Sequence, residues 1–136
     1  MLKNDNDYWK LIKNINNQRL FLPNELELVS FLKKEEETYR ISGEEMFKRA
    51  EEMQVNFNQL QAEYLFEWQE KIPEEWRQNF PIFPGTIRFR YLRRGSSDGE
   101  YVVPYLYWNN GWHRYFWYLK YGFGHRDRFL RPREIV

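Results

Sequence analysis

Residues 100–118 read EYVVPYLYWNNGWHRYFWY and decide the fold that we predict for this chain. β-Branched and aromatic residues dominate the stretch, and they favour strands over helices. Asn110-Gly111 near its centre is a dipeptide that strongly favours a two-residue type I′ turn. We therefore expect two antiparallel strands, residues 100–109 and 112–121, joined at this turn.

A third strand precedes this hairpin. Residues 87–92 read IRFRYL, in which apolar and basic side chains alternate with the period of a strand. Residues 95–99, GSSDG, form a flexible hairpin loop to the next strand. The chain thus predicts a three-stranded antiparallel β-meander. Pro104 falls in mid-strand and lacks an N–H group, so we expect a bulge there, or a part of the strand left unpaired.

The register of the meander decides which side chains face solvent. A two-residue turn places Trp112 opposite Asn109 and Phe116 opposite Tyr105, and we expect Phe89 to pair with Tyr105 from the other side. One face is then nearly all apolar and packs on the helices. The opposite face is half basic and half aromatic, and it carries Arg88, Arg90, Leu106, Trp108, His113, Tyr115 and Trp117.

Upstream of the meander the hydrophobic spacing is helical. We expect one helix over residues 7–17 and a second over Asn24–Arg40, with Asn24 as its N-cap. Residues 42–45, SGEE, form a capping box that begins a third helix. Its apolar residues recur at alternating intervals of four and three from Met46 to Tyr64, and Trp68 follows after a further four residues. This coiled-coil-like seam predicts one continuous helix as far as Ile72.

That long helix would measure about 45 Å, at roughly 1.5 Å per residue. Its seam needs a partner along its whole length, either the preceding helix with the β unit or a second copy of the chain in a homodimer. Pro73 ends the helix and opens a short one over residues 74–80. The predicted fold class is therefore α+β: an N-terminal helical hairpin with one long helix, then the three-stranded β-meander, then a basic tail.

Charge is distributed unevenly along the chain. The net charge is +1, yet residues 1–84 hold 11 basic and 16 acidic side chains, whereas residues 85–136 hold 10 and 4. Residues 81–85, PIFPG, mark the change. We divide the chain into an acidic helical region, 1–82, and a basic aromatic region, 83–136, packed as one compact unit. The asymmetry indicates either a basic half that meets an anion or two halves that attract each other.

Several classes of function lack the residues that they need. The chain has no cysteine, so it forms neither disulfides nor thiolate metal sites, and His125 with Asp127 gives too few metal ligands. No P-loop, dinucleotide-binding, serine-hydrolase or HExxH motif occurs. No export signal and no membrane-spanning apolar run is present. We expect a small cytoplasmic protein that is not an enzyme and uses no cofactor, metal or membrane.

A sheet face that interleaves arginines and rings suits nucleic acid, because rings stack on bases for roughly 1–3 kcal/mol each while arginines hold phosphates. We therefore expect an accessory or regulatory protein that binds single-stranded or duplex nucleic acid through this face and the basic tail. The residues expected to contact nucleic acid or a partner are Arg88, Arg90, Arg93, Arg94, Trp108, His113, Tyr115, Trp117, Arg126, Arg128, Arg131 and Arg133.

Two other interpretations of these residues stay open. Trp, Tyr and Arg are also the residues enriched at interface hot spots, so the face could dock a protein, as an inhibitor of phage or mobile-element type or as a subunit of a complex. Alternatively, Arg88 and Arg90 stack on Tyr115 and Trp117 as structural cation–π pairs, or they pair with glutamates of the long helix.

Residues 85–91, GTIRFRY, and residues 103–111, VPYLYWNNG, together with Tyr118, resemble an uncharacterised group of small prokaryotic proteins. In that group a "GPYYY…W…G…RYLG" pattern follows an arginine-rich first strand, and its members are similar to accessory proteins of mobile elements and plasmids. The resemblance covers about residues 85–121; it implies the meander and a prokaryotic or phage context, and no reaction. Many members carry a cysteine-rich first hairpin, whereas this chain has GSSDG at 95–99, so no role of those cysteines transfers.

Overall fold

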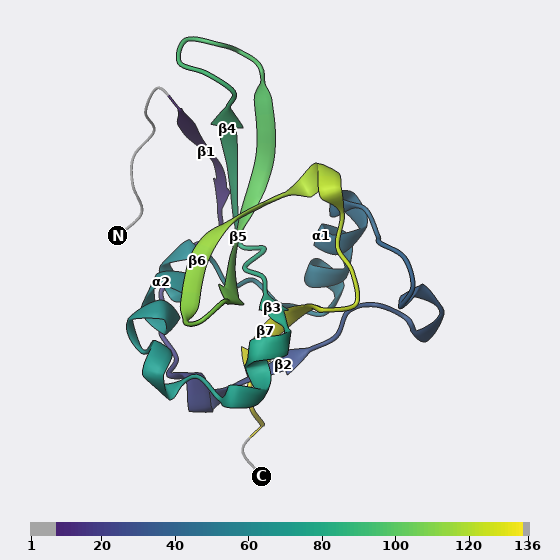
Figure 1. The fold of residues 1–136 in the computed structure, drawn as a ribbon, viewed down its shortest axis with the longest axis vertical. Helices are drawn as coiled ribbons and strands as arrows, with labels where there is room; N and C mark the ends of the chain where they lie inside the picture. The colour runs from purple at the N-terminus through teal and green to yellow at the C-terminus, as the bar shows by residue number, and fades with distance from the viewer. Residues whose placement is uncertain (1–7, 135–136) are drawn as a thin grey trace.

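The computed structural model describes residues 8–134, and in this range the chain is mostly β (Figure 1). Two sheets and two α-helices make up the fold. The strands are β1 (Trp9–Asn14), β2 (Leu26–Val29), β3 (Phe80–Pro81), β4 (Thr86–Tyr91), β5 (Gly99–Trp108), β6 (Trp112–Tyr118) and β7 (Asp127–Pro132). The helices are α1 (Gly43–Glu52) and α2 (Gln59–Glu67), with short 3-10 turns at Pro23–Glu25, Lys34–Glu36, Gln69–Lys71, Glu74–Gln78 and Leu119–Tyr121.

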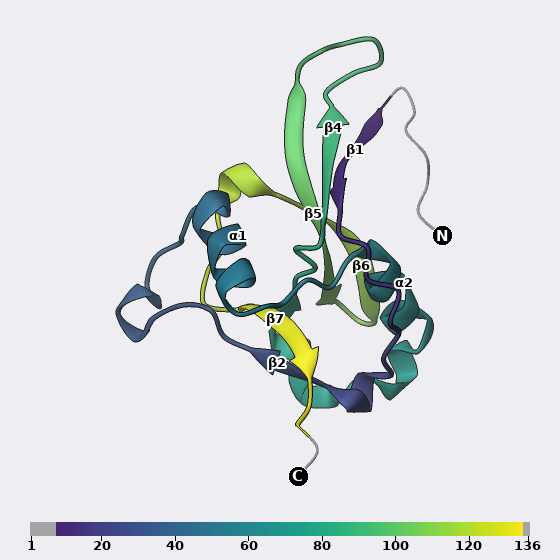
Figure 2. The same cartoon turned by 180° about the vertical axis from the view of Figure 1, so that it is seen from behind.

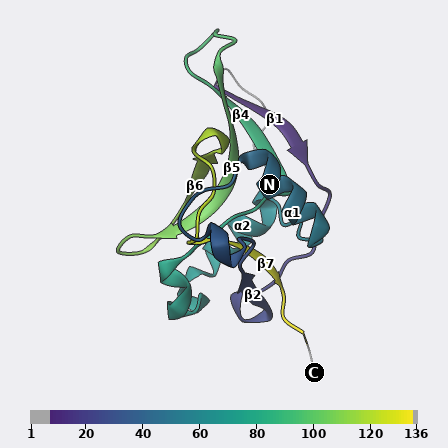
Figure 3. The same cartoon turned by 90° about the vertical axis from the view of Figure 1, so that its right-hand side faces the viewer.

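Strands from both ends of the chain interleave in the two sheets. The first sheet has the order β1-β4-β5-β6 and is antiparallel throughout. The second has the order β2-β7-β3, in which β3 runs parallel to β7. A bridge between Ile82 and Tyr105 joins the two sheets, and the N–H of Phe83 donates to the carbonyl of Pro104 at 3.0 Å. Figure 3 shows β4 and β5 rising together above the second sheet.

Two apolar clusters form the core, one under each helix. α2 packs with Leu65 against Leu106 and Trp112 of the first sheet. α1 packs with Met46 against Val103 and, from the second sheet, Phe129. Val102 and Val103 are both fully buried, because the middle of β5 is covered on both faces. Figures 1 and 2 show α1 and α2 on the two sides of this strand.

The predicted helical hairpin is wrong, and the first two helices are absent. Residues 9–14 of the first form β1, which pairs with β4 from Trp9 opposite Arg90 to Asn14 opposite Thr86. An unpaired edge of β4 would leave its backbone groups without partners, and pairing with β1 satisfies them. The second predicted helix contains β2, which pairs with β7. Asn24 is not an N-cap: Glu25 accepts a hydrogen bond from the backbone N–H of Leu22 at 2.7 Å, within a short 3-10 turn.

The single long helix is also wrong. The N-cap at Ser42 is confirmed, since its Oγ accepts from the N–H of Glu45 at 3.1 Å. The helix then ends at Glu52, and Gln54 adopts the left-handed conformation with φ of 57°. A second N-cap at Asn58, which accepts from the N–H of Gln61, begins α2. The predicted Pro73 boundary leads into a 3-10 turn rather than an α-helix.

This break removes the coiled-coil-like seam, and with it the reason for expecting a homodimer along that seam. Met46, Ala50 and Phe57, three members of the predicted seam, are buried inside one chain. Trp68 lies beyond the end of α2 and is half exposed. The heptad-like spacing therefore reflects two separate helices, each packed on its own core cluster.

The three meander strands are present, but their register differs from the prediction. Trp112 pairs with Trp108 instead of Asn109, because the loop has three residues, with positive φ at Asn110 and Gly111. Every β6 side chain is thereby shifted by one position relative to β5. Phe89 pairs with Tyr101 rather than Tyr105.

The predicted basic tail is not a tail. Residues 127–132 form β7, the middle strand of the second sheet, and they bury Phe129 and Leu130 completely. Phe129 and Leu130 in the middle of the arginine-rich segment explain this placement, because burying these two large apolar side chains stabilises the folded chain more than solvation of the segment would.

Candidate nucleic-acid interface

The two arginines predicted to lie together on β4 share one face of the strand but differ in burial. Arg88 is 3% exposed, and its Nε donates to Oε1 of Gln59 on α2 at 2.7 Å. Arg90 is half-buried, and its Nη1 donates to the hydroxyl of Tyr118 at 2.9 Å. Its guanidinium group also lies 5.4 Å from the ring centre of Trp9. Arg88 is thus part of the interior, whereas Arg90 remains at the surface.

A continuous set of aromatic rings runs over β5, β6 and the 3-10 turn that follows β6. The ring centre of Tyr105 lies 5.4 Å from that of Tyr107, and Tyr107 stacks on His113 at 5.0 Å. Tyr105 also meets Trp117 edge-on at 5.8 Å, and Trp117 contacts Tyr121 at 5.6 Å. We name this set the β6 aromatic surface; its members are Phe80, Tyr105, Tyr107, His113, Trp117 and Tyr121.

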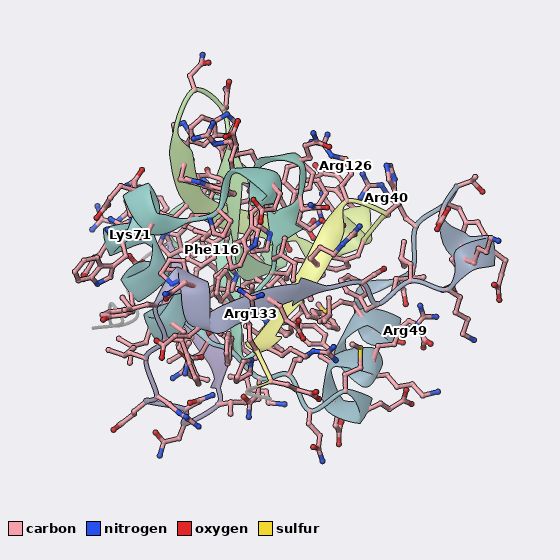
Figure 4. The ribbon with its side chains drawn as sticks, turned by 90° about the horizontal axis from the view of Figure 1, so that it is seen from below. Arg40, Arg49, Lys71, Phe116, Arg126 and Arg133 are labelled. Carbon is pink, nitrogen blue, oxygen red and sulfur yellow. The ribbon has the colours of Figure 1, made fainter. Side chains whose placement is uncertain are left out.

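Arginines border the β6 aromatic surface. Arg40 lies 5.7 Å from the ring centre of Trp117, and Arg126 lies 4.8 Å from that of Phe80. The Nη1 of Arg40 donates to the carbonyl of Gly122 at 3.3 Å, and the Nε of Arg126 donates to the carbonyl of Gln78 at 2.8 Å. Figure 4 shows Arg40 and Arg126 close to the same end of β7. Both guanidinium groups are therefore held in place at the edge of the rings.

In the part of the chain that the structure describes, these arginines form no direct ion pair, although Asp127 lies within electrostatic reach of Arg40 and Arg128. Among residues 8–134, Arg40, Arg90, Arg126 and Arg128 donate to carbonyl or hydroxyl oxygens and form no ion pair. Arginines elsewhere do form ion pairs with glutamates, and those pairs are Arg49–Glu36, Arg77–Glu74, Arg114–Glu63 and Arg131–Glu27. Of these arginines, Arg40 and Arg126 lie directly beside the rings.

One carboxylate lies beneath this surface. Asp127 is buried at the start of β7, and its Oδ2 accepts from the N–H of Gly124 at 2.6 Å. Burial raises the pKa of Asp127 to about 6, although this hydrogen bond and the charges of Arg40, Arg128 and His125 act in the opposite direction. Burial likewise raises the pKa of Tyr105 to about 12, with a contribution from the charge of Asp127. The negative charge of this site is therefore lost in mild acid.

The other predicted contact residues are scattered. Arg93 and Arg94 are exposed in the loop between β4 and β5, at the top of Figure 1. Trp108 is half-buried under the guanidinium group of Arg77, 3.8 Å from its ring centre. Tyr115 is the exception: it is exposed, it pairs with Tyr105 between β5 and β6, and its hydroxyl lies 3.4 Å from Nη1 of Arg90. The predicted contacts Arg131 and Arg133 lie at the far end of β7, and Arg131 pairs with Glu27 at 2.7 Å.

Of the predicted residues, the structure therefore brings together His113, Tyr115, Trp117 and Arg126, and it places Arg128 beside Asp127. Sequence reasoning missed Arg40, Phe80 and Tyr121, and it assigned Tyr105 and Tyr107 to the core face. Arg40 lies in a segment predicted as helix, and no local pattern places it beside Trp117. The two tyrosines could have been found by testing a three-residue loop at Asn110-Gly111, which exchanges the two faces of β5 relative to β6.

No three His, Asp or Glu side chains among residues 8–134 are grouped as a metal site requires. Over the same residues, no helix combines the length and the apolar character needed to cross a membrane. No protein-family model matches the chain, and comparisons with curated proteins and with solved structures give no significant match. The resemblance of residues 85–121 to mobile-element accessory proteins stays a prediction.

Proposed function

We propose that this protein binds single-stranded nucleic acid, without catalysing a reaction, through the β6 aromatic surface and the arginines beside it. The observation that carries the proposal is that Arg40 and Arg126, which form no ion pair with any residue that the structure describes, lie beside contiguous rings, with Arg128 close to Asp127. Single-strand binding proteins combine the same two elements, a positive groove for the backbone and rings on which bases stack.

The exposed rings favour unpaired bases over a duplex. Tyr121 is 52% exposed, and His113 is exposed on top of Tyr107. Bases inside a duplex are already stacked on each other, so a flat ring gains little by approaching them. A single strand offers base faces to such rings, and each stacked base contributes roughly 1–3 kcal/mol. We assign the role of an accessory or regulatory protein of the cytoplasm to this binding activity.

Anisotropy of a fluorescent single strand of about 20 nucleotides tests the proposal, since one binding fold covers roughly 4–16 nucleotides. The variant to test is R40Q/R126Q, which removes two charges beside the rings. The control is R131Q, because Arg131 lies on β7 and is paired with Glu27. We expect R40Q/R126Q to bind at least about tenfold more weakly and R131Q to bind nearly as well as the wild type. Equal affinities of all three proteins would contradict the proposal.

A second candidate function is docking of a protein partner. The hairpin of β4 and β5 favours it, because Leu92 is 69% exposed and Tyr101 is 50% exposed near its tip. Such apolar and aromatic side chains are typical anchors of a protein interface. Pull-down from the native host, with and without nuclease treatment, separates the two functions. A partner that survives nuclease and is lost in L92D would favour the second candidate.

A further inference from the structure

A pocket of about 260 Å³ lies between α2 and the first sheet, and it shares Tyr105 with the β6 aromatic surface. Its polar lining comes from three elements: Gln59 and Glu63 of α2, Arg88 of β4 and Arg114 of β6. The aromatic lining comes from Trp9, Tyr105, Tyr115 and Phe116, and Figure 4 shows Phe116 on the α2 side of the molecule. An apolar pocket with a few converging polar groups is the usual form of a small-molecule site.

The polar groups of this pocket are tied into one chain of hydrogen bonds. Arg88 donates to Oε1 of Gln59 at 2.7 Å, and Nε2 of Gln59 donates to Oε1 of Glu63 at 3.4 Å. The other carboxylate oxygen of Glu63 accepts from Nη1 of Arg114. The backbone N–H of Gln59 donates to Oγ1 of Thr86 at 2.8 Å, which fixes the start of α2 against β4. Glu63 and Arg114 thus present an acceptor and a donor side by side at the rim.

The aromatic side of the pocket suits a flat ligand. The ring centres of Trp9 and Phe116 are 4.9 Å apart and the rings are tilted by 43°, so they form an angled wall. The volume falls slightly below the range of roughly 300–1,000 Å³ that is usual for drug-sized ligands. A ligand that fills the pocket is therefore small, no larger than one or two fused rings.

We propose that this pocket binds a single nucleobase, and that guanine is preferred. The inference deepens the proposed function and rests on it for the source of the base, because a single strand can place one unstacked base in a protein pocket. The Watson–Crick edge of guanine carries an acceptor, O6, next to two donors, the N1–H and N2–H₂ groups. Glu63 accepts from such donors while Arg114 donates to O6. Adenine has an acceptor at N1, which would face the carboxylate.

Isothermal titration calorimetry of the full chain with GMP, AMP and ribose 5-phosphate tests the pocket. The variant is E63Q, and the matched control is E74Q, which removes the same charge from the solvent-exposed pair with Arg77. We expect GMP to bind the wild type at least about tenfold more tightly than AMP, as the loss of a charged hydrogen bond implies. We expect E63Q to lose this preference and E74Q to keep it.

Equal binding of GMP and AMP to the wild type would overturn the inference, and so would a GMP preference that E63Q retains. Binding of ribose 5-phosphate as tight as that of GMP would also overturn it, since the phosphate alone would then be recognised. R40Q/R126Q separates this inference from the proposed function. If only the guanine pocket is wrong, this variant still weakens oligonucleotide binding. If only single-strand binding by the β6 aromatic surface is wrong, the GMP preference and its dependence on Glu63 remain.

Discussion

Arg88 on β4 donates a hydrogen bond to Gln59 on α2 at 2.7 Å, so that a guanidinium group expected in solvent lies 3% exposed between helix and sheet. This contact ties the first residue of α2 to the first sheet. The arginines of the chain thus fall into those that hold the fold together and those, such as Arg40 and Arg126, that border the β6 aromatic surface.

Replacement of Arg88 is therefore expected to destabilise the fold. R88M removes the donor of a buried charged hydrogen bond and leaves Oε1 of Gln59 without it, at a cost of about 2–3 kcal/mol in the free energy of unfolding. R93M, in the exposed loop between β4 and β5, should change stability by less than about 0.5 kcal/mol. Urea denaturation measures both. An R88M protein as stable as R93M would show that the contact with Gln59 does not stabilise the fold.

The stacking role of the β6 aromatic surface can be tested with two equally exposed tyrosines. Tyr121 contacts Trp117 and is 52% exposed, whereas Tyr101, at 50%, lies on the hairpin and contacts Phe89. We expect Y121A to weaken binding of a single strand by roughly 1–3 kcal/mol and Y101A to leave it nearly unchanged. Anisotropy titration measures both affinities. A larger loss of affinity in Y101A than in Y121A would show that the single strand binds at the hairpin of β4 and β5 instead.

The raised pKa of Asp127 predicts how stability depends on pH. The folded-state pKa of about 6 lies above the ordinary value of 3.8, so the folded state holds the proton more tightly than the unfolded state does. The stability gained from protonated Asp127 is therefore complete below about pH 4 and is lost as the pH rises through 6. D127N should be more stable than the wild type at neutral pH, by up to roughly 3 kcal/mol, and equally stable near pH 4.

Urea denaturation of both proteins across this pH range checks the prediction. The charged groups that face Asp127 are Arg40, Arg128 and His125, and all three favour its ionised form. A wild type more stable than D127N at neutral pH would show that these charges outweigh the effect of burial.

The break between α1 and α2 predicts a stabilising substitution. Gln54 has φ of 57°, a conformation that costs a residue with a side chain roughly 1–2 kcal/mol but not glycine. Glycine is more flexible in the unfolded chain, which offsets part of this gain. We expect Q54G to stabilise the protein by about 0.5–1 kcal/mol, whereas K48G, inside α1, should destabilise it by about 1 kcal/mol. Thermal unfolding distinguishes them, and equal losses of stability would contradict the prediction.

The same residue shows why sequence analysis succeeded for part of the fold and failed for the rest. The strands β4, β5 and β6 were predicted because alternation is a local property, and the N-cap at Ser42 because capping is local too. Nothing local distinguishes the left-handed Gln54 from a helical residue. β1 and β2 are short, and their extended form is set by pairing with β4 and β7, which are 70 or more residues away in the chain.

The candidate site depended on one loop length. Asn110-Gly111 occurs in two-residue and in three-residue hairpin loops, and the two choices place opposite faces of β6 beside a given face of β5. The three-residue loop brought Tyr105 and Tyr107 beside His113 and Trp117. The sequence thus predicted a surface of rings and arginines. Most of the residues that form it could not be predicted, because they come from elements that only the tertiary structure brings together.

The salt dependence of single-strand binding tests the central claim most directly. Each phosphate neutralised on a single strand contributes about −0.7 to the slope of log K against log salt concentration. If Arg40, Arg126 and Arg128 each hold a phosphate, the wild type should show a slope of about −2, and R40Q/R126Q a slope smaller in magnitude by about 1.4. Absence of binding at low salt, or a slope near zero, would contradict the account.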